Sequence, residues 1–232
     1  MSDIDNKKAA RIAGIWYLLF FLSAGISQIY LNKTFVLNNA IATAQHILAT
    51  QSEFVLTFLS SLFGHVLCFL LLVLALYRLL KDVNGKQARL MLSLVLVSVS
   101  VMFVILIFQI CSLFVLTRAE YFTALSKKQV YEIATLFLQM RFIGEYVVGI
   151  FWGLWLFPLA YLVYQSGFIP KFIAWLLVLS GIAHITDCVL YLTDINTHSL
   201  ITSYLSIPVA LGELAMMLWL LIKGVSKPKG NK

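Results

Sequence analysis

The sequence has 232 residues, of which 61% are hydrophobic and only 12% are charged, and it carries a net charge of +7. Soluble domains carry about 25% charged residues, and here apolar runs of about 20 residues recur along the chain, so the composition excludes a soluble globular protein. The basic residues gather at the ends of these runs and form no arginine-rich patch with interleaved aromatics, which argues against nucleic-acid binding.

The apolar runs predict an all-α integral membrane protein with six transmembrane helices in a single bundle. In chain order the predicted spans are Arg11–Leu31, Phe54–Leu80, Ala88–Thr117, Gln139–Gln165, Phe172–Thr193 and Tyr204–Val225. The first run follows basic residues, as a signal peptide does, but it continues to Tyr30. That length favours an uncleaved first span.

Lysine and arginine predict the orientation of the spans. Twelve of them flank one side of the predicted bundle: Lys7, Lys8, Arg11, Arg78, Lys81, Lys86, Arg89, Lys171, Lys223, Lys227, Lys229 and Lys232. The opposite loops hold four: Lys33, Arg118, Lys127 and Lys128. Because cytoplasmic loops carry the excess of basic residues, both termini are predicted to be cytoplasmic.

The segments between the spans contain recognisable start, stop and break signals. Residues 38–52 are expected to form a short amphipathic helix behind an asparagine cap. Ser126 and Gln129 match a capping box, so the helix that begins there is longer than a bilayer requires and must project, tilt or break. Pro158 is one candidate break, Pro208 is another, and Gly167 with Pro170 predicts a tight turn.

Six ionisable residues lie within or at the rim of the predicted spans: His65, Arg141, Glu145, His184, Asp187 and Glu213. Counting from the predicted cytoplasmic ends at 1.5 Å per residue puts Asp187 at roughly 22 Å, His65 near 20 Å, His184 at roughly 18 Å and Glu213 near 15 Å. Arg141 and Glu145 lie higher. None falls in the inner third of a core about 30 Å thick. This predicts a polar pocket that opens toward the outside.

The charges of this set do not balance, since three carboxylates face one arginine when the histidines are neutral. Unpaired charge is expensive in lipid, and the sequence leaves three remedies open. The carboxylates hold protons, both histidines are charged, or a cation, metal or amine occupies the site. His65, His184, Asp187 and Glu213 are the candidate ligands if a divalent metal binds.

Each of these residues also has a purely structural interpretation. His184 and Asp187, three apart on one helical face, can simply bond to each other. Arg141 can reach the headgroups or pair with Glu145, and His65 can be a packed, hydrogen-bonded core residue. Glu213 is the strongest functional candidate, because no charge lies near it in sequence and Pro208 can bend its helix.

Three stretches resemble a known family of small bacterial multi-pass membrane proteins, named domain of unknown function 4386. They are "RIAGIWYLL", "FWGLWLFPLAYLVYQSGFIPKFIAWLLVLSG" and "LGELAMMLWLLIKGV". The residues that match recurrent family positions are Arg11, Gly14, Gly153, Pro158, Ser166, Gly167, Pro170, Asp187, Gly212, Glu213 and Trp219. The resemblance covers nearly the whole chain and implies a location in the bacterial inner membrane. It implies no activity, and it supports Asp187 and Glu213 rather than the other four residues.

The leading functional hypothesis is a protein that binds or transports a small molecule, cation or lipid through this polar pocket. The sequence leaves open an intramembrane metal-dependent hydrolase that uses the same residues, and a non-catalytic membrane scaffold. The sequence lacks the HExxH, GxSxG and GxGxxG patterns, which favours a protein without enzyme activity and predicts no cofactor. The expected partners are membrane lipids and this ligand, with the oligomeric state left open.

Overall fold

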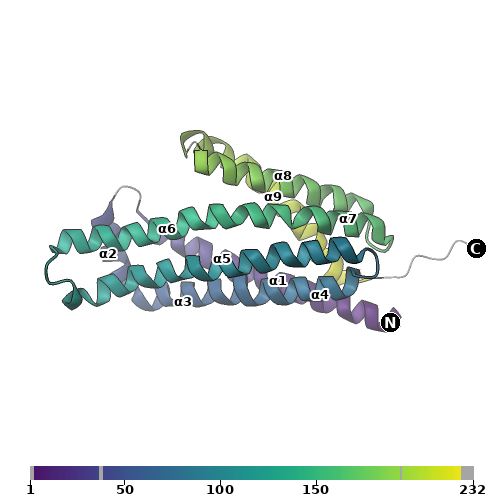
Figure 1. Ribbon diagram of the computed structural model, residues 1–232, viewed down its shortest axis with the longest axis horizontal. Coiled ribbons are helices and arrows are strands. Elements are labelled where there is room, and N and C mark those ends of the chain that lie inside the picture. The colour runs from purple at the N-terminus through teal and green to yellow at the C-terminus, as the bar shows by residue number, and fades with distance from the viewer. Residues whose placement is uncertain (1–2, 37–38, 194, 226–232) are drawn as a thin grey trace, which may run out of the picture. The chain divides into compact units, whose positions relative to one another are not determined.

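The structure is a computed structural model that describes residues 3–36, 39–193 and 195–225. These residues form helices and no strands (Figure 1). The helices are α1 Asp3–Thr34, α2 Ala40–Ala49, α3 Gln51–Ser61, the π-helical η1 Leu62–Cys68, α4 Phe69–Leu80, α5 Gly85–Thr117, the 3-10 turn η2 Ala119–Tyr121, α6 Lys127–Leu154, α7 Leu156–Ser166, α8 Lys171–Thr193 and α9 Ile195–Ile222.

The described residues contain six helical stretches that are long and apolar enough to cross a membrane, as the sequence predicts. They are Lys7–Thr34, Gln51–Leu80, Gly85–Thr117, Lys127–Ser166, Lys171–Thr193 and Tyr204–Ile222. The largest departure is the fourth stretch, which begins twelve residues before the predicted Gln139 because the capping box starts the helix at Lys127. The all-α membrane fold is therefore confirmed.

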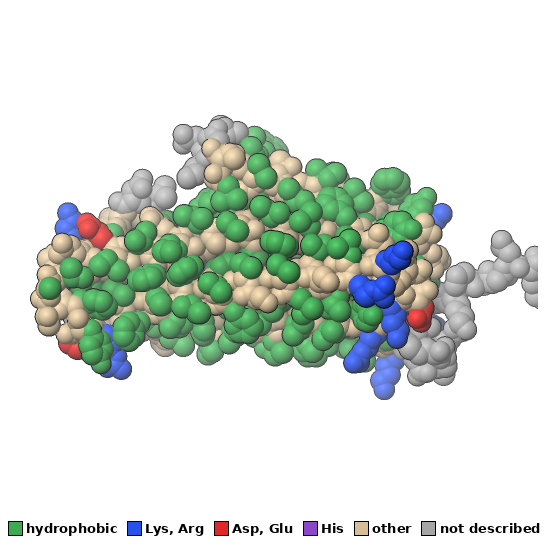
Figure 2. All heavy atoms as spheres, viewed as in Figure 1, with side chains coloured by type: hydrophobic (Ala, Val, Ile, Leu, Met, Phe, Trp, Pro, Cys, Tyr) green, Lys and Arg blue, Asp and Glu red, His purple; other side chains and the backbone are tan. Residues whose placement is uncertain are grey.

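The side chains are arranged as in a protein that is solvated by lipid. On the face that Figure 2 shows, most side chains are hydrophobic, and lysine and arginine appear in a few small groups. Large apolar residues such as Leu56 and Trp175 are more than 60% exposed. Ser61, Gln109 and Arg141 are instead fully buried. Polar groups turn inward because hydrocarbon cannot satisfy their hydrogen bonds.

The contacts within the chain divide it into two compact units. Unit 1 comprises Met1–Leu19, Cys68–Val99 and Tyr146–Lys232, and unit 2 comprises Phe20–Leu67 and Ser100–Glu145. The boundaries fall inside α1, η1, α5 and α6, so these helices contribute residues to both units.

Unit 2 contains an apolar core built around the short helix α2. Its buried members include Leu31, Ile47, Phe54 and Leu138. The Asn39 side chain accepts a hydrogen bond of 2.9 Å from the Ala42 N–H, which confirms the predicted cap of α2. The capping box before α6 is also present, since Ser126 and Gln129 each bond the other's backbone N–H through their side chains.

Unit 1 contains the predicted helix break and the predicted tight turn. The helix is interrupted at Trp155, between α6 and α7. Pro158 explains the break, because it lacks the N–H that would bond the carbonyl of Leu154. Gly167 then ends α7 in a left-handed conformation with φ of 69°. The chain reverses there, and α8 packs against both α7 and α9.

Candidate functional site

The six ionisable residues of the spans fall into two groups of three. His65, Arg141 and Glu145 belong to unit 2, whereas His184, Asp187 and Glu213 belong to unit 1. Arg141 and Glu145 pair directly in unit 2. In unit 1, Glu213 and Asp187 accept hydrogen bonds from different residues, Tyr17 and Thr202.

Arg141 is the centre of the polar network in unit 2. Its Nη2 lies 2.9 Å from Oε1 of Glu145, one turn later on α6. Its Nε donates to Oε1 of Gln109 on α5 at 2.9 Å, and its Nη2 also reaches the Ser61 hydroxyl of α3 at 3.5 Å. Ser61 in turn hydrogen-bonds Ser27 of α1. One buried arginine therefore joins helices from across the unit.

This network is electrically neutral and almost complete. Arg141 is 0% exposed and Glu145 only 9%, so the pair is held away from lipid and water. Within this network, Nη1 of Arg141 is the one buried side-chain atom that has no hydrogen-bond partner among the described residues. Removing one member of a buried ion pair strongly destabilises the folded protein, because the other charge is left without a partner. The pair can therefore act as a structural cross-link between helices.

His65 lies next to this network, in the middle of the π-helical segment η1. Its ring is 8% exposed and contacts Phe20 edge-to-face, with centroids 5.7 Å apart. The preceding Gly64 lies so close to Ser23 of α1 that any side chain at position 64 would clash with the serine hydroxyl. π-helical turns are rare and often occur at functional sites, so His65 stays a candidate beside its structural interpretation.

Glu213 lies in unit 1 on α9, and its partner is a tyrosine of α1. The Tyr17 hydroxyl donates a hydrogen bond of 2.8 Å to Oε2 of Glu213. Tyr17 is fully buried, whereas Glu213 keeps part of its surface exposed. Among the described residues no lysine, arginine or histidine forms an ion pair with Glu213. This carboxyl group differs from Glu145 because no residue in the described part of the chain pairs it with an opposite charge.

Aromatic rings surround the Tyr17 side of this pair. Trp155, at the break between α6 and α7, packs against Tyr17 with ring centroids 6.4 Å apart. Phe69 of α4 contacts the same indole edge-to-face at 5.2 Å. Electron-rich ring faces attract cations, and they do so most strongly where water is excluded. The setting combines one carboxyl group with three aromatic rings.

His184 and Asp187 lie in the second half of α8. The His184 ring contacts Trp152 of α6 edge-to-face at 6.1 Å. Oδ1 of Asp187 accepts a hydrogen bond of 3.2 Å from the Thr202 hydroxyl of α9. Both residues are partly buried. They connect α8 to its two neighbours.

A metal centre finds no support in these positions. In the portion of the chain that the structure describes, no group of three or more His, Cys, Asp or Glu side chains is arranged to hold a metal ion. The candidate ligands His65, His184, Asp187 and Glu213 therefore do not form such a group among the described residues.

Sequence reasoning missed Tyr17 and Trp155 as companions of Glu213. A signal for Tyr17 was available, since it lies ten residues after Lys7 and Glu213 lies ten residues before Lys223. At 1.5 Å per residue both are about 15 Å from the same predicted membrane surface. The Trp155 contact depends on the exact position of the helix break, which the pattern of residues does not give.

Comparison with known proteins identifies the family and nothing further. A family model described as "Domain of unknown function (DUF4386)" matches residues 12–224, so the chain belongs to this family, as the sequence resemblance predicts. No curated protein and no solved structure matches the chain.

Proposed function

We propose that this DUF4386 protein is a binding or transport protein that exchanges a proton for a small organic cation at Glu213. The observation that carries the proposal is a carboxyl group within a membrane-length helix whose described partner is a hydroxyl and not a cation. Ionisable residues in such helices are rare and expensive, and they mark ligand or ion pathways by default.

The contrast with Arg141 supports this choice of residue. Arg141 and Glu145 neutralise each other at 2.9 Å, so their site has no need of a ligand charge. Glu213 has no such partner, and two states satisfy it: a bound proton or a bound cation. Alternation between these two states is an exchange reaction, in which the carboxyl releases its proton to water as the cation binds.

The surrounding aromatic rings favour an organic cation over a hydrated metal ion. Tyr17, Trp155 and Phe69 pack against one another in turn, and all three rings are buried. Quaternary ammonium groups are recognised by such rings, whereas Mg²⁺ and Ca²⁺ require several oxygens. The ligand class is therefore a small amine or quaternary ammonium compound.

We further propose that the protein lies in a bacterial inner membrane with both termini in the cytoplasm. The excess of Lys and Arg on one side of the predicted spans supports this orientation. With this orientation Glu213 lies near the bilayer midplane, and the absence of span carboxylates from the inner third favours entry from outside.

Tetraalkylammonium ions of increasing size test the proposal. The purified protein in detergent is titrated with tetramethyl- to tetrabutylammonium chloride, and binding is followed by tryptophan fluorescence, to which Trp155 contributes. We expect saturable binding that weakens as the pH falls, because protons compete for the same carboxyl. Glu213→Gln should weaken binding by at least about tenfold, or about 1.4 kcal/mol. Tyr17→Phe should weaken it less, because the carboxylate charge remains.

Glu132→Gln is the matched control, since Glu132 is an exposed carboxylate on α6. It should bind as the wild type does. The proposal is wrong if the wild type shows no saturable binding of any ion in the series, or if Glu213→Gln binds equally well. If Glu213→Gln lowers only the melting temperature, the residue serves the fold and the scaffold interpretation is correct.

A further inference from the structure

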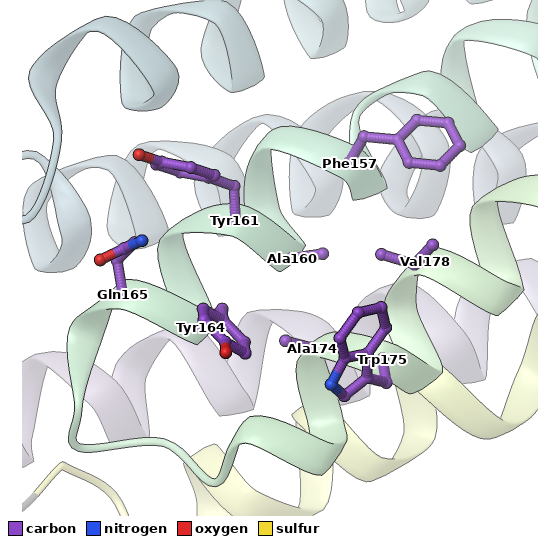
Figure 3. Close-up of a pocket in the computed structure, with 8 residues that line it drawn as sticks. All are labelled: Phe157, Ala160, Tyr161, Tyr164, Gln165, Ala174, Trp175 and Val178. Carbon is purple, nitrogen blue, oxygen red and sulfur yellow. The ribbon is translucent and has the colours of Figure 1, made fainter.

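A groove runs along the outer side of the α7–α8 hairpin in unit 1, far in sequence from Tyr17 and Glu213. Its cavity volume is about 400 Å³. Figure 3 shows Ala160 of α7 and Ala174 of α8 between larger side chains, and these two small residues leave the space open. The Tyr164 and Trp175 rings meet edge-to-face across it, with centroids 6.2 Å apart.

The two ends of the groove differ in polarity. Tyr161, Tyr164 and Gln165 line the end next to the turn, and Phe157 and Val178 line the other end (Figure 3). Along α7, Phe157 and Gln165 are eight residues apart, which is about 12 Å at 1.5 Å per residue. The groove thus passes from amphipathic side chains to purely apolar ones over most of one leaflet, which is about half of a hydrocarbon core about 30 Å thick.

Lys171 is the only lysine, arginine, aspartate or glutamate between residues 146 and 186. Lys171, the first residue of α8, holds its Nζ 4.8 Å from the centroid of the Tyr164 ring, at the polar end of the groove. Residues 146–186 contain no aspartate or glutamate. An anion at this end therefore has a cation beside it, and residues 146–186 contribute no repelling carboxylate.

Trp175 and Tyr164 are also well exposed, at 66% and 40%. Aromatic side chains with a polar tip favour the level of the lipid headgroups, and a lysine there reaches the phosphate layer. This places the polar end of the groove at the membrane–water boundary and its apolar end among the acyl chains.

We propose that the α7–α8 groove binds an anionic phospholipid of the leaflet that faces the α7–α8 turn. One acyl chain lies over Ala160 and Ala174, and the phosphate lies beside Lys171 and the Tyr164 hydroxyl. The groove matches such a lipid in shape and in charge. Its apolar end suits the acyl chain, its amphipathic end suits the ester region, and Lys171 suits the anionic headgroup. This lipid site is separate from the proposed exchange at Glu213 and does not depend on it.

Brominated phospholipids test the site, because bromine on an acyl chain quenches a tryptophan that it touches. The full-length protein is reconstituted in nanodiscs that contain brominated phosphatidylglycerol or brominated phosphatidylcholine at equal fractions. We expect phosphatidylglycerol to quench Trp175 with about fivefold higher apparent affinity, which is the preference one lysine near an anionic surface supplies.

Three variants separate the outcomes. Trp175→Phe should remove the quenching that depends on the headgroup, and Lys171→Gln should abolish the preference while Trp175 is still quenched. Lys86→Gln, which removes an exposed lysine on α5 outside the groove, should behave as the wild type. All three positions are exposed, so these variants should fold.

The proposal is overturned if both lipids quench Trp175 equally in the wild type, or if Lys171→Gln keeps the full preference. It is equally overturned if Trp175 is shielded from both lipids, which would show that a second copy of the chain or another protein covers the groove.

Discussion

At the scale of single residues, two buried ionisable sites in the spans differ in how their charge is compensated. Arg141 meets Glu145 at 2.9 Å and adds Gln109 and Ser61, so its charge is compensated inside the protein. Among the described residues, the hydrogen-bond donor to the Glu213 carboxyl group is the Tyr17 hydroxyl. The first arrangement holds helices together, and the second leaves a carboxyl group that a ligand can complete.

Removing one member of the Arg141–Glu145 pair should destabilise the protein strongly. Arg141→Met leaves Glu145 buried without its counter-charge, and we expect a loss of about 3 kcal/mol or more in the free energy of unfolding. The double variant Arg141→Met/Glu145→Met should recover part of that loss, because no charge is then buried. Chemical unfolding in mixed micelles measures both.

The exposed pair Lys128–Glu132, on the same helix and 3.9 Å apart, is the control. Lys128→Met should change stability by less than about 1 kcal/mol. If Arg141→Met were equally mild, the network would not be a structural cross-link, and Arg141 would have to be considered for ligand binding.

The sequence alone shows that Arg141, Glu145 and Glu213 lie within apolar runs, but it does not show which residue pairs with each of them. Arg141 precedes Glu145 by four residues, the less favourable order for a helical ion pair, and its side chain could instead have reached the headgroups. The partner of Arg141 depends on where the side chains of Gln109 and Ser61 lie, and the packing of the helices determines those positions.

At the scale of helices, close approach in unit 1 depends on glycine. A Cβ at Gly153 of α6 would lie 2.9 Å from the carbonyl oxygen of Gly181 on α8, and 2.6 Å from Cγ1 of Ile185. A Cβ at Gly212 of α9 would lie 2.6 Å from the Leu176 carbonyl oxygen of α8. Small residues allow such approach, which is a major source of helix association in membranes.

Gly153→Ala should therefore destabilise the protein, by about 1–3 kcal/mol, because the backbone of α8 must move away. Gly25→Ala is the control, since no heavy atom lies within 4 Å of the Cβ position at residue 25. That change should be neutral or stabilise α1 by up to about 1 kcal/mol, because alanine is the better helix former. Melting temperatures of the two variants in detergent give the comparison, and a neutral Gly153→Ala would contradict the close crossing.

Helix signals in the sequence were informative to different degrees. The capping box at Ser126 and Gln129, the cap at Asn39 and the turn at Gly167 appear as predicted, since local chemistry determines them. The π-helical segment Leu62–Cys68 was not predicted, because no residue pattern in "LFGHVLC" distinguishes it from an α-helix. It depends on how α1 packs against Gly64.

At the scale of the whole molecule, composition alone was sufficient to predict a membrane protein with six spans, and the described helices confirm it. The orientation stays a prediction. It can be tested with single cysteines in exposed loop positions: Thr123→Cys in the α5–α6 loop and Asp82→Cys in the α4–α5 loop.

In intact bacterial cells, a membrane-impermeant maleimide should label Thr123→Cys and should reach Asp82→Cys only after the membrane is permeabilised. The expectation follows from the excess of basic residues beside Asp82. The reverse pattern would place the termini outside, and would move the α7–α8 lipid groove to the outer leaflet.

The most direct test of the central claim is the proton balance of cation binding. Protein in weakly buffered detergent solution is mixed with the tightest-binding tetraalkylammonium ion, and a pH indicator reports the protons released. Exchange at Glu213 predicts release of about one proton per cation bound, as one carboxyl group requires, together with loss of the infrared band of a protonated carboxyl. Both signals should be absent in Glu213→Gln. Cation binding without proton release in the wild type, or release that persists in Glu213→Gln, would contradict the account.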